Sequence, residues 1–153
     1  MIENLPARPG PPPRVSDQTP QQQLSQNAPY HLQQELYQRC LTLTGVRPHP
    51  SHVSVPGARA LSRAAPHTSR PEAFMGGAEF VHIHPSYDGS LHACLPFPAA
   101  LAVLAAGWGQ FHPYAGQVVP VGTMLIYGPR DSGELETCWS IVLASYQHTG
   151  AES

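Results

Sequence analysis

Lysine is absent from this chain, and all eight of its basic residues are arginine. The absence excludes reactions that need a lysine amine, such as Schiff-base catalysis, and it excludes a lysine-containing phosphate-binding P-loop. The arginines form no run or stripe, and the net charge is -2 with histidine neutral. We therefore expect no nucleic-acid partner and no membrane partner. No obligate protein partner is evident either.

Cysteine and long apolar runs are also scarce. The three cysteines, Cys40, Cys94 and Cys138, show no CxxC spacing. This usage is typical of reduced residues in a cytoplasmic protein. The most apolar stretch, residues 96–106, is too short to span a bilayer, and the N-terminus shows no signal-peptide pattern. The sequence predicts a soluble, cytoplasmic protein.

Residues 1–28 differ in composition from the rest of the chain. They are dense in Pro and Gln and have few apolar side chains to bury. Such a segment gains too little from burial to offset the entropy lost on ordering, so we expect a disordered tail. Residues 29–150 are predicted to form a single domain.

The hydrophobic pattern of this domain predicts an α+β fold. Helices are expected over residues 30–44, 98–106 and, after a capping-box start, 131–149. Strands are expected at 79–84, 91–95 and 123–127, with weaker extended pieces at 52–56 and 58–62. Residues 64–77 and 108–120 are expected to be loops, the first of them a candidate rim or lid. These elements predict a small antiparallel sheet of about four to five strands packed with about three helices on one face.

The densest functional signal is the hairpin pattern of residues 79–92. Residues two apart in a strand share a face, so His82 and His84 point the same way, together with Phe80. A three-residue loop at 87–89, with Gly89 left-handed, would pair His84 directly with His92. Imidazole is the side chain that titrates near neutral pH and is the commonest metal ligand. Three of them on one face therefore predict a functional site.

The same register sends a set of apolar residues to the opposite face, toward a core: Val81, Ile83, Leu91, Ala93 and Leu95. Strand alternation places Glu79 on the face opposite to the histidines unless a bulge reorients it. It is either a solvated strand-end carboxylate or a hydrogen-bond acceptor or general base for an imidazole. His112 is the fourth candidate imidazole. The other histidines are interpreted as structural or surface residues: His31, His49, His52, His67 and His148.

The loop at residues 107–116 combines glycine, aromatic and polar residues. Above a histidine face it could form a pocket for a flat, partly apolar ligand; equally, it could be a connection that packs Trp108 into the core. Arg130 could recognise an enolate or a carboxylate, or could pair with Glu134 or Asp131 at the start of the last helix.

These residues carry a resemblance to the domain of the fungal luciferases that oxidise 3-hydroxyhispidin. The matching motifs are Glu79-x-x-His82-x-His84, then Leu91-His92, Gly107-Trp-Gly-Gln-x-His-Pro-x-Ala-Gly116, Tyr127-x-Pro-Arg130 and Ala144-Ser145. Together they cover a little under half of the chain.

The resemblance implies an oxidoreductase that adds O2, as co-substrate, to an enolic α-pyrone without flavin, haem or another cofactor, and that can emit light. It implies that His84 or His82 is the catalytic base, supported by His92, His112 and Glu79. It implies that the small aromatic or pyrone-like substrate is bound by a second set of residues, Trp108, Gln110, Tyr127 and Arg130.

Two other functions fit the same spacing. His82, His84 and His92 could supply three ligands on one side of a Zn or non-haem Fe ion, with Cys94, Glu79 or His112 completing the coordination sphere. Alternatively, the domain could be a non-catalytic module that binds a small aromatic molecule.

Overall fold

The computed structural model describes residues 2, 4–64 and 70–150. Its helices are α1 (Tyr30–Cys40), α2 (Phe97–Ala106) and α3 (Ser132–His148), with a short 3-10 helix at Pro71–Ala73. Its strands are β1 (Val46–Pro50), β2 (Arg59–Arg63), β3 (Glu79–Ile83), β4 (Leu91–Cys94), β5 (Gly109–Phe111) and β6 (Thr123–Ile126). They form one sheet in the order β1-β2-β3-β4-β6-β5, antiparallel throughout. The α+β prediction is confirmed, with six strands in the described part of the chain.

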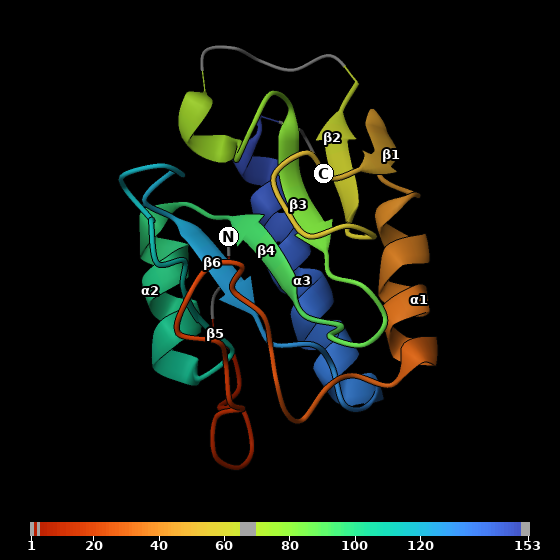
Figure 1. Cartoon of the computed structure of the whole chain (residues 1–153), viewed down its shortest axis with the longest axis vertical. Helices are drawn as coiled ribbons and strands as arrows, with labels where there is room; N and C mark the ends of the chain where they lie inside the picture. Colours follow the sequence, from red (N-terminus) through yellow and green to blue (C-terminus); the bar gives the residue numbers. More distant parts are fainter. Residues whose placement is uncertain (1, 3, 65–69, 151–153) are drawn as a thin grey trace.

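The helices leave one face of the sheet to other segments. In Figure 1, α3 crosses behind β3 and β4, while α1 and α2 flank it on either side. The core lies between these helices and the rear of the sheet, where the apolar hairpin residues meet α3 residues such as Leu135 and Ile141. All five apolar positions predicted to face the core are buried there: Val81, Ile83, Leu91, Ala93 and Leu95. The opposite face therefore holds the histidines.

Helix ends follow the local sequence closely. Asp131 has extended backbone geometry and its side chain accepts a hydrogen bond from Glu134 N at 2.8 Å, which caps α3 as predicted. Gly107 ends α2 with φ +86°, a left-handed conformation that favours glycine. The first helix is shorter than predicted, because its regular hydrogen bonding stops at Cys40.

Two edge strands, β1 and β5, were missed by the strand pattern. β1 contains Pro48 and Pro50, which are tolerated only where no neighbouring strand needs their missing N–H. β5 begins at Gly109, where a side chain would collide with the backbone oxygen of Leu125. Residues 52–56 are bends and turns, so the extended piece predicted there is wrong. In the candidate lid 64–77, residues 65–69 lie outside the described residues.

The N-terminal segment, whose composition predicts a disordered tail, makes hydrogen bonds with the rest of the domain. Residues 4–28 lie along the front of the sheet, on the side away from α3 (Figure 1). Arg8 N donates to Ala106 O at 2.9 Å, and the Trp108 indole donates to Pro6 O at 2.6 Å. Side-chain amides of Gln21 and Gln23 are buried against the domain. Specific hydrogen bonds thus add to the few apolar contacts that the segment makes with the core through Ile2 and Leu5.

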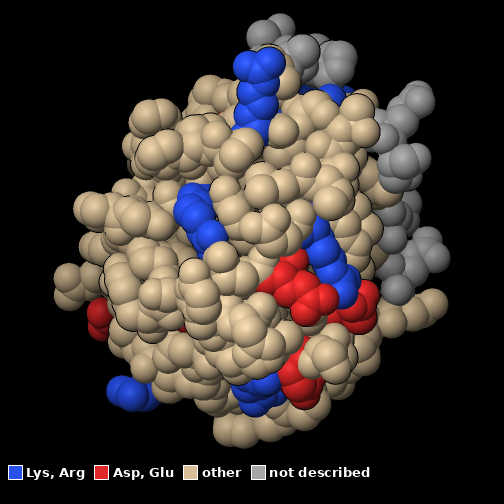
Figure 2. Space-filling view, turned by 90° about the vertical axis from the view of Figure 1, so that its right-hand side faces the viewer, with Lys and Arg blue, Asp and Glu red and all other residues tan. Residues whose placement is uncertain are grey.

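Among the described residues, no helix combines the length and apolarity required to cross a membrane. On the face of the molecule in Figure 2, the basic side chains stand apart from one another.

The capping interaction of Asp131 is testable by stability. We expect Asp131→Ala to lower the free energy of unfolding by about 1 kcal/mol, because the first turn of α3 loses its side-chain acceptor. Urea denaturation followed by circular dichroism measures this. The exposed neighbour Ser132 provides the control, since Ser132→Ala should change stability by less than about 0.5 kcal/mol. Equal effects of the two substitutions would contradict the capping role.

Candidate active site

The hairpin between β3 and β4 brings three imidazoles together in a register two residues away from the predicted one. His82, not His84, pairs directly with His92. The connection contains five residues, 85–89, because Pro85 O accepts from both Asp88 N and Gly89 N. Gly89 is left-handed at φ +77°, as predicted. A shift of two residues preserves strand parity, so the histidines still share a face.

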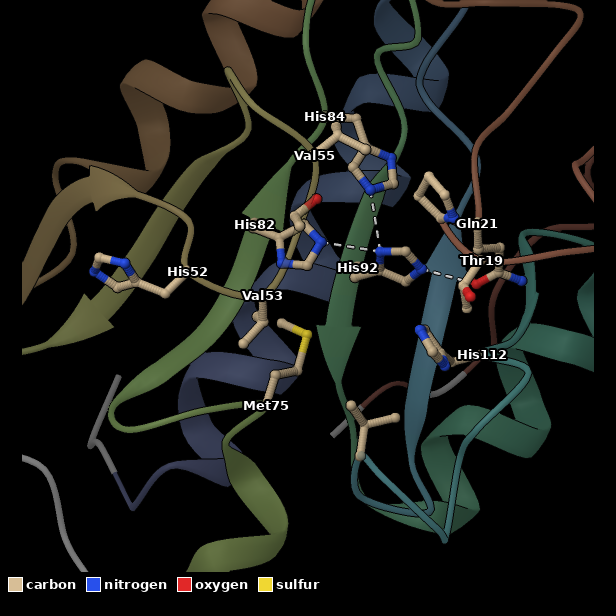
Figure 3. Close-up of a pocket in the computed structure, with 13 residues that line it drawn as sticks. Thr19, Gln21, His52, Val53, Val55, Met75, His82, His84, His92 and His112 are labelled. Atoms are coloured by element: carbon tan, nitrogen blue, oxygen red, sulfur yellow. Dashed lines mark hydrogen bonds between the residues drawn. The ribbon is translucent and has the colours of Figure 1, made fainter.

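The three rings form one buried cluster. His92 Nδ1 lies 3.0 Å from His82 Nε2 and 3.1 Å from His84 Nε2. The side chains are only 2 to 4% exposed. Figure 3 shows the rings of His82 and His84 turned toward His92 from neighbouring strands. The predicted convergence of these three residues is thus present in the structure.

Each ring is held from behind by an oxygen. His82 Nδ1 lies 2.7 Å from Glu79 Oε2, and His92 Nε2 lies 2.8 Å from Gln21 Oε1. His84 Nδ1 lies 2.9 Å from Ser90 Oγ and 3.2 Å from Asp88 Oδ2. The inner nitrogens of the cluster are therefore His82 Nε2, His84 Nε2 and His92 Nδ1.

A β-bulge explains how Glu79 reaches the histidine face. Leu61 pairs with Val81 but Ser62 pairs with Glu79, so β3 carries one extra residue at Phe80. The extra residue reverses the face of the sheet toward which the preceding side chains of β3 point. Glu79 joins the imidazoles, and Phe80 turns to the helices, where its ring packs on Tyr146. The prediction that Phe80 points with the histidines is wrong for this reason.

The oxygen partners assign the imidazole tautomers. Carboxylates only accept, so Nδ1 of His82 and of His84 each carry the proton. The Gln21 amide nitrogen donates to Phe111 O at 3.1 Å, which turns the amide oxygen toward His92 and assigns the proton to His92 Nε2. When neutral, all three histidines therefore present a ring nitrogen without a hydrogen to the middle of the cluster.

Burial disfavours the charged form of His82 and of His92. It lowers the pKa of His82, with the nearby His84 adding to the effect, although the hydrogen bond to Glu79 opposes it. Burial, followed by repulsion from His82 and His84, places the pKa of His92 well below its ordinary value. The contact between Glu79 and His82 is a hydrogen bond from the ring N–H at Nδ1 to the carboxylate. For Asp88, burial favours the neutral form, but hydrogen bonds from His84 and Ser90 keep the carboxyl pKa below its usual value.

The cluster forms the floor of a cavity of about 450 Å³. This volume suits a drug-sized molecule. Apolar side chains line it together with the rings: Val53, Val55, Met75 and Val119. Met75 belongs to the segment predicted as a rim or lid. Thr19, Pro20 and Gln21 of the N-terminal segment form another part of the wall.

Two further histidines line this cavity. His112 is only partly buried and its ring lies 5.2 Å from that of His92, so the prediction that it joins the site agrees with its position. Burial, and to a smaller extent His82, lower the pKa of His112. His52 also lines the cavity, although the sequence did not single it out. Its ring stacks on His49 and lies apart from the cluster in Figure 3.

The four residues expected to bind substrate do not line this cavity and have other partners. Trp108 is buried in the core, as its alternative interpretation had it. The Tyr127 hydroxyl donates to Gln110 Oε1 at 3.1 Å, and the Arg8 guanidinium lies over the Tyr127 ring. Arg130 pairs with Glu134 at 2.6 Å, the alternative that the sequence left open. The N-terminal segment contacts this part of the molecule.

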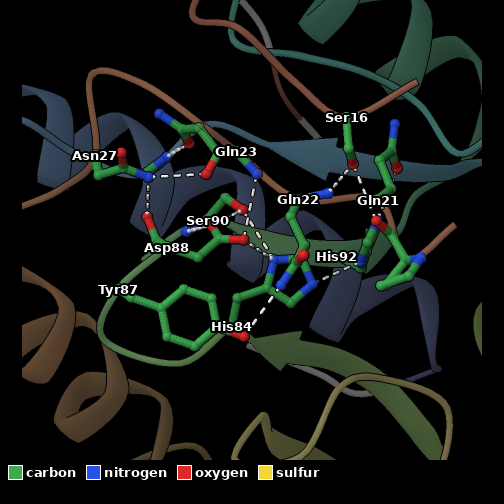
Figure 4. Close-up of polar contacts among 12 residues, drawn as sticks. Ser16, Gln21, Gln22, Gln23, Asn27, His84, Tyr87, Asp88, Ser90 and His92 are labelled. Carbon is green, nitrogen blue, oxygen red and sulfur yellow. Dashed lines mark hydrogen bonds and ion pairs between the residues drawn. The ribbon is translucent and has the colours of Figure 1, made fainter. Parts of the chain in front are cut away.

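Three residues of the site were not found from the sequence: Gln21, Asp88 and Ser90. Asp88 has a recognisable local signal, because Asp before Gly-Ser often accepts from the backbone two residues on, and Ser90 N donates to it at 2.8 Å. Figure 4 shows that Asp88 also accepts from Gln23 N, at 3.2 Å. Gln21 gives no such signal, because its contacts are with residues about 70 and 90 positions away.

One group of side chains in the described part of the chain could hold a metal ion. It consists of His82, His84 and His92, whose ligand atoms lie within 4.8 Å of one another. Cys94, predicted as an additional ligand, instead lies with its sulfur 3.4 Å from the Thr123 hydroxyl.

Comparison with known proteins identifies the stretch that carries this site. Residues 77–145 match the model of the luciferase domain family. The chain is 40% identical over 70 residues to the luciferase of Armillaria ostoyae, and 39% identical over the same length to those of Armillaria mellea and Neonothopanus nambi. The aligned part is 44% of this chain but 26% of each relative. No solved structure matches. The resemblance to fungal luciferases predicted from the sequence is confirmed over this domain region.

The carboxylate of Asp88 should be critical for the shape of the site. We expect Asp88→Ala to lower the free energy of unfolding by about 3 kcal/mol, because four buried donors, from Gln23, His84 and Ser90, lose their acceptor at once. Hydrogen exchange should increase over residues 20–27 while α3 stays protected. Urea denaturation and peptide-resolved exchange measure the two effects. The control is Asp17→Ala, which removes an exposed carboxylate from the same N-terminal segment.

Proposed function

We propose that the luciferase-domain stretch and the cavity in front of it form an oxygenase that adds O2 to an enolic small molecule. The proposed substrate class is an α-pyrone with an enolic hydroxyl, of the 3-hydroxyhispidin type. One observation carries the proposal: buried imidazoles line a cavity of suitable size, and the outer nitrogen of each ring is already bound to an oxygen atom. The similarity of residues 77–145 to fungal luciferases supports the reaction class.

The first step is removal of the enol proton. A neutral imidazole with a free lone pair is a general base, and His84 and His82 both have this form. Glu79 and Asp88 stand behind them and stabilise the imidazolium that forms when the proton arrives. The carboxylates do not take the proton themselves; they hold each ring in the accepting tautomer.

The second step joins the enolate to oxygen. The enolate carbon supplies electrons, a C–O bond forms, and both oxygen atoms of O2 enter the product, so the substrate is oxidised without a separate reductant. Neighbouring imidazolium charge stabilises the developing peroxide anion. The apolar side chains of the cavity, such as Val53 and Met75, limit access of water to this intermediate.

Light emission is the further step that the luciferase resemblance suggests. An endoperoxide that loses CO2 can leave its carbonyl product in an excited state, and a dry cavity preserves the intermediate long enough for this. We propose no organic cofactor for either step.

The proposal is tested by mixing the purified chain with 3-hydroxyhispidin in air while recording oxygen uptake and photons. We expect one O2 to be consumed for each substrate molecule. The rate of oxygen uptake should fall by about 100-fold or more in His84→Ala, because the general base is lost. Photon counts tell whether the product is formed in an excited state.

The matched control is His31→Ala, which removes an exposed imidazole from α1 and should leave uptake within about two-fold of the parent. Circular dichroism establishes that each variant is folded. Binding of the pyrone without oxygen uptake would refute the oxygenase and favour a non-catalytic binding module.

A further inference from the structure

We infer that His82, His84 and His92 form a binding site for one divalent transition-metal ion, with the ion seated between their three inner nitrogens. The inference goes beyond the proposed function, because ion binding can be measured whatever substrate the cavity accepts. Three features of the structure support it independently.

The first feature is an excess of acceptors. The oxygens behind the rings bind the outer N–H groups, so each neutral histidine presents a bare lone pair inward. His92 Nδ1 meets two such nitrogens at 3.0 and 3.1 Å. Acceptors at hydrogen-bond distance repel unless a cation lies between them. One proton can join only one pair of nitrogens at a time, whereas a metal ion accepts all three lone pairs.

The second feature is the spacing of the nitrogens. Two imidazole nitrogens bound at about 2.0–2.1 Å to a tetrahedral ion are separated by about 3.3 Å. The two short contacts of His92 are within a few tenths of an ångström of this value, and all three ligand atoms lie within 4.8 Å of one another. Because two such bonds span at most about 4.2 Å, binding of the ion would draw the outermost ring toward the other two.

The third feature is buried negative charge. Glu79 and Asp88 are 2% and 0% exposed. Among the described residues, their ion-pair contacts are with His82 and His84 only, and neither contacts an arginine. Buried carboxylates need a compensating cation nearby. A divalent ion held by the rings would balance the charges of the two carboxylates, with one imidazole ring between the ion and each carboxylate.

The surroundings also match those of metal sites. A metal-bound histidine usually donates its other N–H to a carboxylate or a carbonyl oxygen, which is what Glu79, Asp88 and Gln21 provide here. Three imidazoles favour zinc, iron, cobalt, nickel or copper over calcium or magnesium, which prefer oxygen. Three protein ligands would leave a coordination position open, as in catalytic rather than structural sites, and all three rings line the cavity.

Such an ion is compatible with the proposed reaction. An enol oxygen that binds a divalent cation loses its proton more readily, because the ion stabilises the enolate. The bound ion would then replace the free imidazole as the group that promotes loss of the enol proton, because the lone pairs of His82 and His84 would be bound to it.

The test uses the full chain, stripped with a chelator and desalted, and titrated with Co2+. Visible absorption bands of cobalt report the ligand type and geometry. We expect one Co2+ per chain with bands of a low-symmetry nitrogen site, and their loss when Zn2+ is added as a competitor.

Three variants locate the ion. His92→Ala should abolish the cobalt bands, since two ligands remain. Gln21→Ala should weaken binding about 10- to 100-fold, because it removes only the oxygen that orients His92. His31→Ala, the control, should bind as the parent does. If His92→Ala does not fold, Gln21→Ala and Glu79→Gln still test the site.

Absence of cobalt bands in the folded parent, or bands that persist unchanged in His92→Ala and Gln21→Ala, would overturn the inference. Oxygen uptake with 3-hydroxyhispidin is recorded on the same samples. Metal binding without oxygen uptake would support the metal site and refute the oxygenase. Oxygen uptake without metal binding would support the oxygenase and refute the metal site.

Discussion

The hydrogen bonds between buried carboxylates and imidazole N–H groups are the interaction on which this site depends. An ionised carboxylate is costly to bury, and Glu79 and Asp88 are both almost fully enclosed. Each is tolerated because it accepts from several donors, a histidine ring among them. The same bonds determine which nitrogen of each ring carries a proton. They therefore direct the lone pairs toward the cavity, and the chemistry proposed for the cavity follows from that direction.

The fold supplies this arrangement through a local irregularity rather than through regular strands. The bulge at Phe80 turns Glu79 onto the histidine face, but it also interrupts hydrogen bonding along β3. Ser145 of α3 compensates, because its hydroxyl lies 3.3 Å from Phe80 O and donates to Cys94 O at 2.7 Å. A helix residue behind the sheet thus stabilises the backbone that positions a carboxylate in front of it. This gives a physical reason for a serine at the end of the luciferase-like motif.

The cavity extends beyond the stretch that resembles known luciferases. Residues 77–145 provide the three clustered imidazoles and His112, but Gln21 completes the hydrogen bonding of His92, and residues 19–21 close one side. These N-terminal residues are attached mainly through amide side chains. Glutamine can be buried here because its amide finds partners: the Gln21 nitrogen donates to Phe111 O, and the Gln23 oxygen accepts from Gly128 N. Any selectivity among enolic substrates would therefore depend partly on residues outside the matched domain.

The sequence by itself determined the features that depend on neighbouring residues. Strand alternation determined that His82, His84 and His92 share a face opposite Val81 and Ile83. Local capping by Asp131 and Gly107 determined two helix ends. Only the tertiary structure decided the five-residue hairpin loop, the bulge at Phe80, the edge strands β1 and β5, and the position of Gln21. Each of these depends on partners distant in the chain, so it cannot be predicted from the periodicity of neighbouring residues.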